Sequence, residues 1–256
     1  MTLAMTHAMT QHLTLITGAS RGLGLALTEQ LLAQGHRVLA LARKPTVAAA
    51  PAGSELIFWE VDLVDSAPVA ERLANWLAAQ DPQAIASVTL INNAGVVSDP
   101  APLSAGHSVD LARALRVGLE APMLLTAAFL RATATWAAPR KVLMVSSGLG
   151  RYAIAGSASY CAAKAGMDNL ARAIALEEAA LPNGAKVVSL APGVIDTDMQ
   201  LQLRNASAER FPERERFVGM KTGGLLMSPA LAATKVLKVL AKADFGSNPI
   251  ADVRDV

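Results

Sequence analysis

A tyrosine and a lysine stand four residues apart in the stretch SASYCAAK, at a spacing that puts both on one face of a helix. They are Tyr160 and Lys164. A tyrosine hydroxyl has a pKa of about 10, so it is a poor acid or base at neutral pH unless a neighbouring ammonium lowers that pKa. Ser147 ends an apolar run thirteen residues before Tyr160 and can donate a hydrogen bond to a carbonyl oxygen. The three together predict proton transfer, although a Tyr-x-x-x-Lys pair alone is also common on helix surfaces.

A glycine-rich turn near the N-terminus is the second candidate. The run TGASRGLG covers residues 17–24, between an apolar run and an amphipathic one. Gly18, Gly22 and Gly24 permit a tight turn and a close backbone approach to a ligand. The helix that follows offers free N–H groups and a positive dipole end to a pyrophosphate, so the turn predicts a dinucleotide site.

Charged residues after the second apolar run indicate which dinucleotide. No Asp or Glu lies between Glu29 and Glu55, where a site for NAD usually has an acid about 20 residues beyond the turn. Arg43 and Lys44 stand there instead, and Arg21 lies inside the glycine turn. Guanidinium groups suit a 2′-phosphate, so NADP(H) is expected. The alternative is that Arg43 and Lys44 only solvate a loop.

The whole composition describes a globular chain with a large core. Of 256 residues 52% are hydrophobic and 17% charged, with a net charge of +2. No basic patch interleaved with aromatics and no apolar run of about 18 residues occurs, so neither nucleic acid nor a membrane is expected as a partner. The single cysteine, Cys161, favours a reducing, cytoplasmic compartment. The four scattered histidines lack zinc-ligand spacing, so no metal site is expected.

Short apolar runs alternate with longer amphipathic ones, which predicts an α/β fold with a doubly wound parallel sheet. Strands are expected at 13–17, 38–42, 56–63, 88–94, 142–147 and 187–191, with helices near 66–80, 108–136, 159–181 and 229–242. Nothing divides the chain, so residues 13–256 are expected to form a single domain after a flexible extension over residues 1–12. The segment 196–228 breaks the alternation and is either a substrate lid or a solvated helical excursion.

Taken together, the chain resembles the short-chain dehydrogenase/reductase family over nearly its whole length. The matching residues are TGASRGLG (17–24), Asp62 in VDL, NNAG (92–95), Ser147, YCAAK (160–164) and PGVIDTDM (192–199). The resemblance implies a Rossmann-like sheet of about seven strands in the order 3-2-1-4-5-6-7, covered by helices on both faces. It also implies NAD(P)-dependent chemistry on a carbonyl or an alcohol.

The resemblance assigns roles to the candidate residues. Ser147 would polarise the substrate oxygen, Tyr160 would donate the proton, and Lys164 would lower the pKa of Tyr160 and hold the nicotinamide ribose. Asp62 would face the adenine, and Asn93 would support the central strands. The implied cofactor contacts are Thr17, Gly18, Ser20, Arg21, Gly22, Leu23, Gly24, Arg43, Asp62, Leu63, Asn93, Ala94, Gly95, Tyr160, Lys164, Pro192, Gly193, Ile195 and Thr197.

The region after residue 192 looks like the branch of this family that contains sepiapterin and benzil reductases. The activity expected from it is NADPH-dependent reduction of a small-molecule carbonyl, either a dicarbonyl or a pterin-like ketone. Two alternatives stay open: a 3-oxoacyl-carrier-protein or general carbonyl reductase, and a non-catalytic NADP-binding sensor or scaffold. The substrate pocket is expected to contain Ser147, Met199, Leu203 and Phe217. The family's usual interface uses the two long helices, so a homodimer or homotetramer is expected.

Gly118 is the main departure from the family pattern. The helix after NNAG usually bears an asparagine whose backbone carbonyl holds a water linked to the lysine, and Gly118 takes that position in VGLEA. A mid-helix glycine costs roughly 1 kcal/mol against alanine, and from the residues alone it indicates either close helix packing or the meeting of two helices. The resemblance implies that the helix is locally distorted here, and a glycine can supply the same carbonyl without resisting that distortion. The missing amide side chain is the only support for the non-catalytic alternative.

Overall fold

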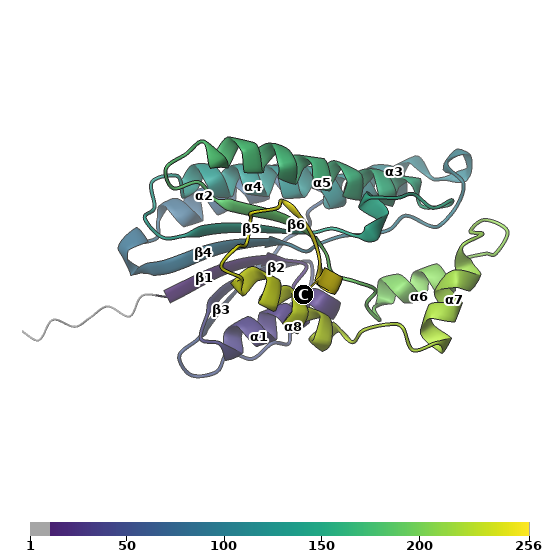
Figure 1. Cartoon of the computed structure of the whole chain (residues 1–256), viewed down its shortest axis with the longest axis horizontal. Coiled ribbons are helices and arrows are strands. Elements are labelled where there is room, and N and C mark those ends of the chain that lie inside the picture. The colour runs from purple at the N-terminus through teal and green to yellow at the C-terminus, as the bar shows by residue number, and fades with distance from the viewer. Residues whose placement is uncertain (1–10, 256) are drawn as a thin grey trace, which may run out of the picture.

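The computed structural model describes residues 11–255, and a sheet of seven parallel strands runs through its centre (Figure 1). The strand order is β3-β2-β1-β4-β5-β6-β7, with every neighbouring pair parallel. The strands are β1 (Gln11–Thr17), β2 (Arg37–Ala42), β3 (Glu55–Glu60), β4 (Ile85–Asn92), β5 (Arg140–Val145), β6 (Lys186–Ala191) and β7 (Ile250–Asp252). The predicted doubly wound fold and strand order are therefore confirmed.

The central strands are continuous apolar runs because helices cover both of their faces. In β2 the five residues after Arg37 are all buried, and in β6 the five after Lys186 are buried. Helices α1 (Gly22–Ala33) and α8 (Pro229–Ala241) cover one face. The other face carries α2 (Ser66–Ala78), α3 (Ser108–Leu115), α4 (Ala121–Ala132) and α5 (Ala158–Ala179), as Figure 1 shows. The sheet thus separates two hydrophobic cores and leaves the carboxyl ends of its strands open.

The segment 196–228 is an excursion beyond β6 that contains α6 (Asp198–Arg204) and α7 (Arg214–Thr222). Its two ends are joined, because Ile195 forms a parallel bridge with Met227 and the Asp196 N–H donates to the Met227 carbonyl at 2.9 Å. Leu203, Phe211 and Phe217 form a small core inside it. We call residues 196–228 the lid for their place at the edge of the open strand ends in Figure 1; that they cover a substrate stays a prediction.

The beginning of the chain differs slightly from the expected boundary. The flexible extension expected over residues 1–12 lies outside the described residues up to Thr10, whereas Gln11 and His12 belong to β1. The His12 imidazole Nδ1 lies 2.7 Å from the Ser87 hydroxyl, which fixes the start of β1 against β4. Among the described helices, none combines the length and the hydropathy needed to cross a membrane.

Candidate active site

Helix α5 presents Tyr160 and Lys164 one turn apart beside the end of β5. The Lys164 Nζ lies 5.6 Å from the centre of the Tyr160 ring and donates a hydrogen bond of 2.7 Å to the carbonyl of Val145. Only 3% of Lys164 is exposed. Burial lowers its pKa to about 8, and the negative charge of Asp168 opposes that shift. The ammonium beside the tyrosine ring is therefore poised to lose its proton far more readily than an exposed lysine.

Tyr160 keeps its proton at neutral pH in the cofactor-free protein. Burial raises the pKa of its hydroxyl to about 12, and a side-chain hydrogen bond with Ser147 works against this shift. Ser147 precedes the 3₁₀ turn η4 (Gly148–Gly150), and its Oγ accepts a bond of 3.2 Å from the Leu149 N–H. The structure thus brings the three predicted catalytic residues together, with a protonated phenol next to a hydroxyl that can orient a carbonyl oxygen.

Asp168 is a buried carboxylate that the sequence analysis missed. It lies one turn beyond Lys164 on α5 and is 2% exposed. Its Oδ1 accepts hydrogen bonds from the Ser146 hydroxyl at 2.6 Å and the Ser189 hydroxyl at 2.7 Å. Through these bonds Asp168 fixes α5 to β5 and β6, while its charge supports the protonated form of Lys164. Its position, four residues after Lys164, was the signal available in the sequence.

The glycine turn and the stretch 92–95 form one rigid unit. The Asn93 side-chain amide donates to the Thr17 carbonyl at 2.9 Å, and the Ala94 N–H donates to the Thr17 hydroxyl at 2.9 Å. Gly18 has a φ of 70° and Gly22 a φ of 54°, values that favour glycine. A Cβ on Gly24 would collide with the Gly18 carbonyl oxygen, so this position also excludes a side chain. Each of the three glycines is thereby explained.

The cleft above this unit fits a dinucleotide. Helix α1 begins after Arg21, which makes no side-chain capping bond, so no side chain at that cap competes with a pyrophosphate for the first N–H groups. A Cβ on Gly95 would lie 3.7 Å from the Lys164 Nζ, which puts the bare backbone of Gly95 beside Lys164. Thr197 contacts the turn from the lid side, because its methyl group lies 3.3 Å from the Cβ position of Gly22. The glycine turn, the start of α1 and Gly95 thus leave a space for a cofactor, and larger side chains at the glycine positions would fill that space.

Two of the predicted cofactor contacts have side chains that are buried in the hydrophobic cores. The Leu23 and Leu63 side chains are buried in the two cores, one on each face of the sheet. Asp62 follows β3 and its Oδ1 accepts a 3.0 Å bond from the Val64 N–H. The remaining predicted contacts, which are Ser20, Pro192, Gly193 and Ile195, lie in the loops after β1 and β6. Their contact with a cofactor stays a prediction.

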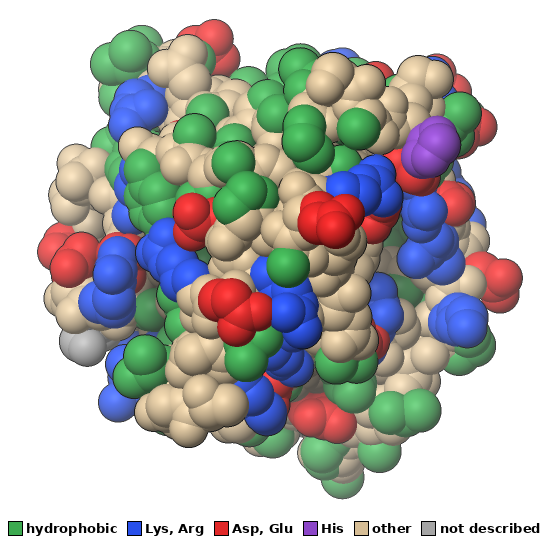
Figure 2. Space-filling view, turned by 90° about the vertical axis from the view of Figure 1, so that its right-hand side faces the viewer, with side chains coloured by type: hydrophobic (Ala, Val, Ile, Leu, Met, Phe, Trp, Pro, Cys, Tyr) green, Lys and Arg blue, Asp and Glu red, His purple; other side chains and the backbone are tan. Residues whose placement is uncertain are grey.

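A cavity of about 310 Å³ lies between the strand ends and the lid. It is lined by Arg21, Arg43, Gly95, Val96, Val97, Asp99, Asp110, Arg113, Asp198, Met199 and Gln202. Figure 2 shows this face of the molecule, where basic side chains form an interrupted band with acidic ones beside it. Two ion pairs join the cavity wall to the lid: Arg21 with Asp198 at 2.6 Å, and Asp99 with Arg210 at 2.8 Å.

Of the four residues expected in the substrate pocket, Met199 lines this cavity, whereas Ser147, Leu203 and Phe217 do not. The contact of Met199 and Ser147 with a substrate stays a prediction. Leu203 and Phe217 instead face Phe211 inside the lid and are 5% and 7% exposed. They are buried because the two short helices of the lid must cover an apolar side of their own. Arg113, Asp110 and Gln202 are cavity residues that sequence reasoning did not single out.

Comparison with known proteins agrees with this arrangement. A family model described as short chain dehydrogenase matches residues 12–208, which include the glycine turn, Ser147, Tyr160 and Lys164. The chain is a short-chain dehydrogenase/reductase. This family binds a nicotinamide cofactor.

Relatives within the family include several carbonyl reductases. A benzil reductase ((S)-benzoin forming) from Bacillus cereus is 33% identical over 90% of this chain and 94% of its own length. A sepiapterin reductase from Meriones unguiculatus is 31% identical over 94% of this chain and 95% of its own length. Among solved structures, a short-chain dehydrogenase/reductase from Burkholderia vietnamiensis is 33% identical, with a TM-score of 0.63 over 96% of this chain and all of that one. The branch suggested by the sequence is thus confirmed.

Gly118 lies where the helical segment is distorted, as the family resemblance implies. The five residues Arg116–Glu120 form a π-helical turn, η3, between α3 and α4, and Gly118 is buried in it. A Cβ at this position would stand 3.0 Å from the Cβ of Ala163, the residue before Lys164. Glycine therefore permits a close contact between the distorted turn and α5.

We expect Gly118→Asn to change turnover by a modest factor, because Ser147, Tyr160 and Lys164 stay in place. The new amide side chain can fix the geometry of the distorted turn, but its Cβ must displace Ala163 by a few tenths of an ångström. Gly118→Ala adds the same Cβ without the amide and serves as the control. The measurement is kcat for the two variants and the parent protein. A parent that is inactive, and that gains activity from Gly118→Asn alone, would refute this expectation.

Proposed function

We propose that this protein reduces a small-molecule carbonyl, a dicarbonyl or a pterin-like ketone, to an alcohol, with NADPH as cofactor and Tyr160 as proton donor. The observation that carries the proposal is the grouping of Ser147, Tyr160 and Lys164 at the end of β5, where the buried Lys164 Nζ lies 5.6 Å from the centre of the Tyr160 ring. A protein that only binds the cofactor has no need for a protonated phenol beside a buried lysine. The non-catalytic alternative therefore depends on Gly118 alone.

The proposed chemistry divides between the cofactor and the chain. The bound cofactor supplies the hydride that the carbonyl carbon accepts. Ser147 donates a hydrogen bond to the carbonyl oxygen and holds it toward Tyr160. Tyr160 transfers its hydroxyl proton to that oxygen, and the Lys164 ammonium stabilises the phenolate that remains. The phenolate then regains a proton from solvent, so the net change is the addition of one hydride and one proton to the C=O bond.

The preference for NADPH rests on charge. Arg21 and Arg43 line the cavity, and the chain has no acid between Glu29 and Glu55 to hold an adenosine ribose through its hydroxyls. A dicarbonyl substrate is favoured by the benzil reductase relatives and by Val96, Val97 and Met199, which make part of the cavity apolar. Gln202 is a hydrogen-bond donor in the same wall and suits a second carbonyl group.

We also propose that the protein works as a homodimer or homotetramer. The two long helical segments carry large apolar side chains in water: Leu115 is 40% exposed, Met123 44% and Leu176 77%. Exposed apolar side chains on neighbouring helices are typical of an interface between subunits. A reducing cytoplasmic location, which the single cysteine favours, is part of the same proposal.

The proposal is tested by following the absorbance of NADPH and, separately, of NADH with a panel of carbonyl compounds. The panel contains an aromatic α-diketone, sepiapterin, an aromatic aldehyde and a 3-oxoacyl thioester. We expect the diketone or sepiapterin to be reduced fastest, with NADPH preferred. Faster reduction of the thioester would favour the carrier-protein alternative. Tight NADPH binding without turnover of any compound would favour a sensor or scaffold.

A further inference from the structure

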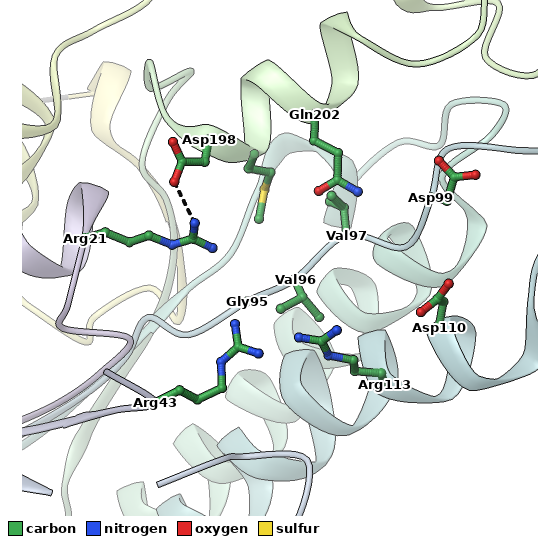
Figure 3. A pocket seen from close by; sticks show the side chains of 11 residues that line it. Arg21, Arg43, Gly95, Val96, Val97, Asp99, Asp110, Arg113, Asp198 and Gln202 are labelled. Atoms are coloured by element: carbon green, nitrogen blue, oxygen red, sulfur yellow. Dashed lines mark hydrogen bonds and ion pairs between the residues drawn. The ribbon is translucent and has the colours of Figure 1, made fainter. Parts of the chain in front are cut away.

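Arg113 is a cavity residue that the proposed reaction does not use. It lies on α3, far in sequence from both the glycine turn and the end of β2, yet it lines the same cavity as Arg43. In Figure 3 the guanidinium groups of Arg43 and Arg113 point toward one another near Gly95 and Val96. Two guanidinium groups directed at one space repel each other unless an anion lies between or beside them.

No carboxylate among residues 11–255 forms an ion pair with either side chain. Asp110 stands one turn before Arg113 on the same helix, but the Arg113 side chain extends away from it and toward Arg43 (Figure 3). Asp198 is engaged by Arg21 at 2.6 Å, and Asp99 by Arg210 at 2.8 Å. The acids of the cavity are thus used elsewhere, and the space between Arg43 and Arg113 keeps a net positive charge.

We propose that Arg113 and Arg43 together hold the 2′-phosphate of NADP(H), so that Arg113 is a specificity-determining residue of the cofactor site. This inference rests on the proposed preference for NADPH. A phosphate monoester carries a charge of about −2 near neutral pH, which two guanidinium groups can match with several charge-assisted hydrogen bonds. Arg21 is the less available partner, since its charge is already shared with Asp198 on the lid.

The test measures binding of small probes by calorimetry, without turnover. The probes are 2′-AMP, which carries the diagnostic phosphate, and 5′-AMP, which does not, together with NADPH and NADH. In Arg113→Met we expect 2′-AMP and NADPH to bind roughly ten- to a hundredfold more weakly, the usual range for losing charge-assisted hydrogen bonds, with 5′-AMP and NADH unchanged. Arg113→Lys keeps the charge and should recover part of the affinity. Arg116→Met removes an exposed arginine that does not line the cavity and is the matched control.

The outcomes separate this inference from the proposed function. If Arg43→Met weakens 2′-AMP binding and Arg113→Met does not, the NADPH preference stands and the role of Arg113 in binding the 2′-phosphate is refuted. The same result is expected if Arg113 binds an anionic substrate instead of the cofactor. An equal loss for 2′-AMP and 5′-AMP in Arg113→Met would show a structural role and also overturn the inference. A wild-type protein that binds 2′-AMP no better than 5′-AMP would refute the NADPH preference itself.

Discussion

Replacing Tyr160 by phenylalanine is expected to lower turnover by roughly 10²- to 10⁴-fold, the usual contribution of a positioned general acid. The substitution removes one oxygen atom and leaves the ring against Lys164. Since burial raises the pKa of Tyr160 to about 12, its hydroxyl is protonated in the cofactor-free protein and can donate that proton to a substrate. Phenylalanine has no proton to donate. NADPH binding should be unchanged, because the glycine turn and the arginines are untouched.

The protein contains a matched control for this experiment. Its other tyrosine, Tyr152, lies close to Gly148 in the same loop region and is 52% exposed. Tyr152→Phe removes the same hydroxyl from a side chain in water and should keep kcat near that of the wild type. The two variants are compared by kcat with the best carbonyl substrate and by calorimetric titration with NADPH. If Tyr160→Phe retained full turnover, Tyr160 would not be the proton donor.

Replacing Lys164 by methionine is expected to produce a comparable loss of turnover together with a change in stability that depends on pH. The variant has no ammonium to stabilise the Tyr160 phenolate, and a single donor of this kind is worth roughly 10²- to 10³-fold. It also leaves the Val145 carbonyl without its 2.7 Å hydrogen bond. That second effect lowers stability by the same amount at every pH.

The pH-dependent part follows from the lowered pKa. In the unfolded chain Lys164 is protonated up to its ordinary pKa of 10.5, whereas in the folded protein it is protonated only up to about 8. The folded wild type therefore bears the full cost of a buried charge below pH 8, and that cost disappears between pH 8 and pH 10.5. The free energy of unfolding of the wild type therefore rises with pH through this window, whereas that of the methionine variant has no such rise. The difference, variant minus wild type, should fall as the pH increases.

Urea unfolding at pH 7 and at pH 9.5 measures this difference. Lys238→Met, which removes an exposed lysine from α8, controls for the loss of a lysine as such. A difference that stayed constant between the two pH values, or that rose, would show that Lys164 is not destabilised by burial. In that case its role beside Tyr160 would need another physical explanation.

Most of this fold can be predicted from the sequence because short, continuous apolar runs that alternate with amphipathic ones are typical of buried parallel strands. Six of the strands appear as apolar runs long enough to be covered on both faces, and β2 and β6 are examples. The seventh strand, Ile250–Asp252, was expected only from the resemblance, because three residues are too few for any periodicity. The distortion at Gly118 was expected from the family resemblance, whereas the glycine followed by Pro122 in one apolar run only indicated that something there departs from a regular helix.

The cavity was harder to predict because it depends on how distant segments meet. Leu203 and Phe217 are apolar residues in a charged segment, and nothing local decides whether such residues face a substrate or each other. Arg113 shares a cavity with Arg43 only because α3 lies beside the end of β2 in the folded sheet. Asp168, by contrast, continues the spacing of Tyr160 and Lys164 along one helix, so the sequence already contained its position.

The most direct test of the account is product analysis with NADPH that carries deuterium at both hydrogens of the nicotinamide C4. The labelled cofactor is incubated with the wild-type protein and an aromatic α-diketone, and the product is examined by mass spectrometry. The account predicts a hydroxyketone with one deuterium on the new carbinol carbon, formed by the wild type and nearly absent with Tyr160→Phe. Oxidation of NADPH without a labelled alcohol, or an alcohol formed equally well by Tyr160→Phe, would contradict it.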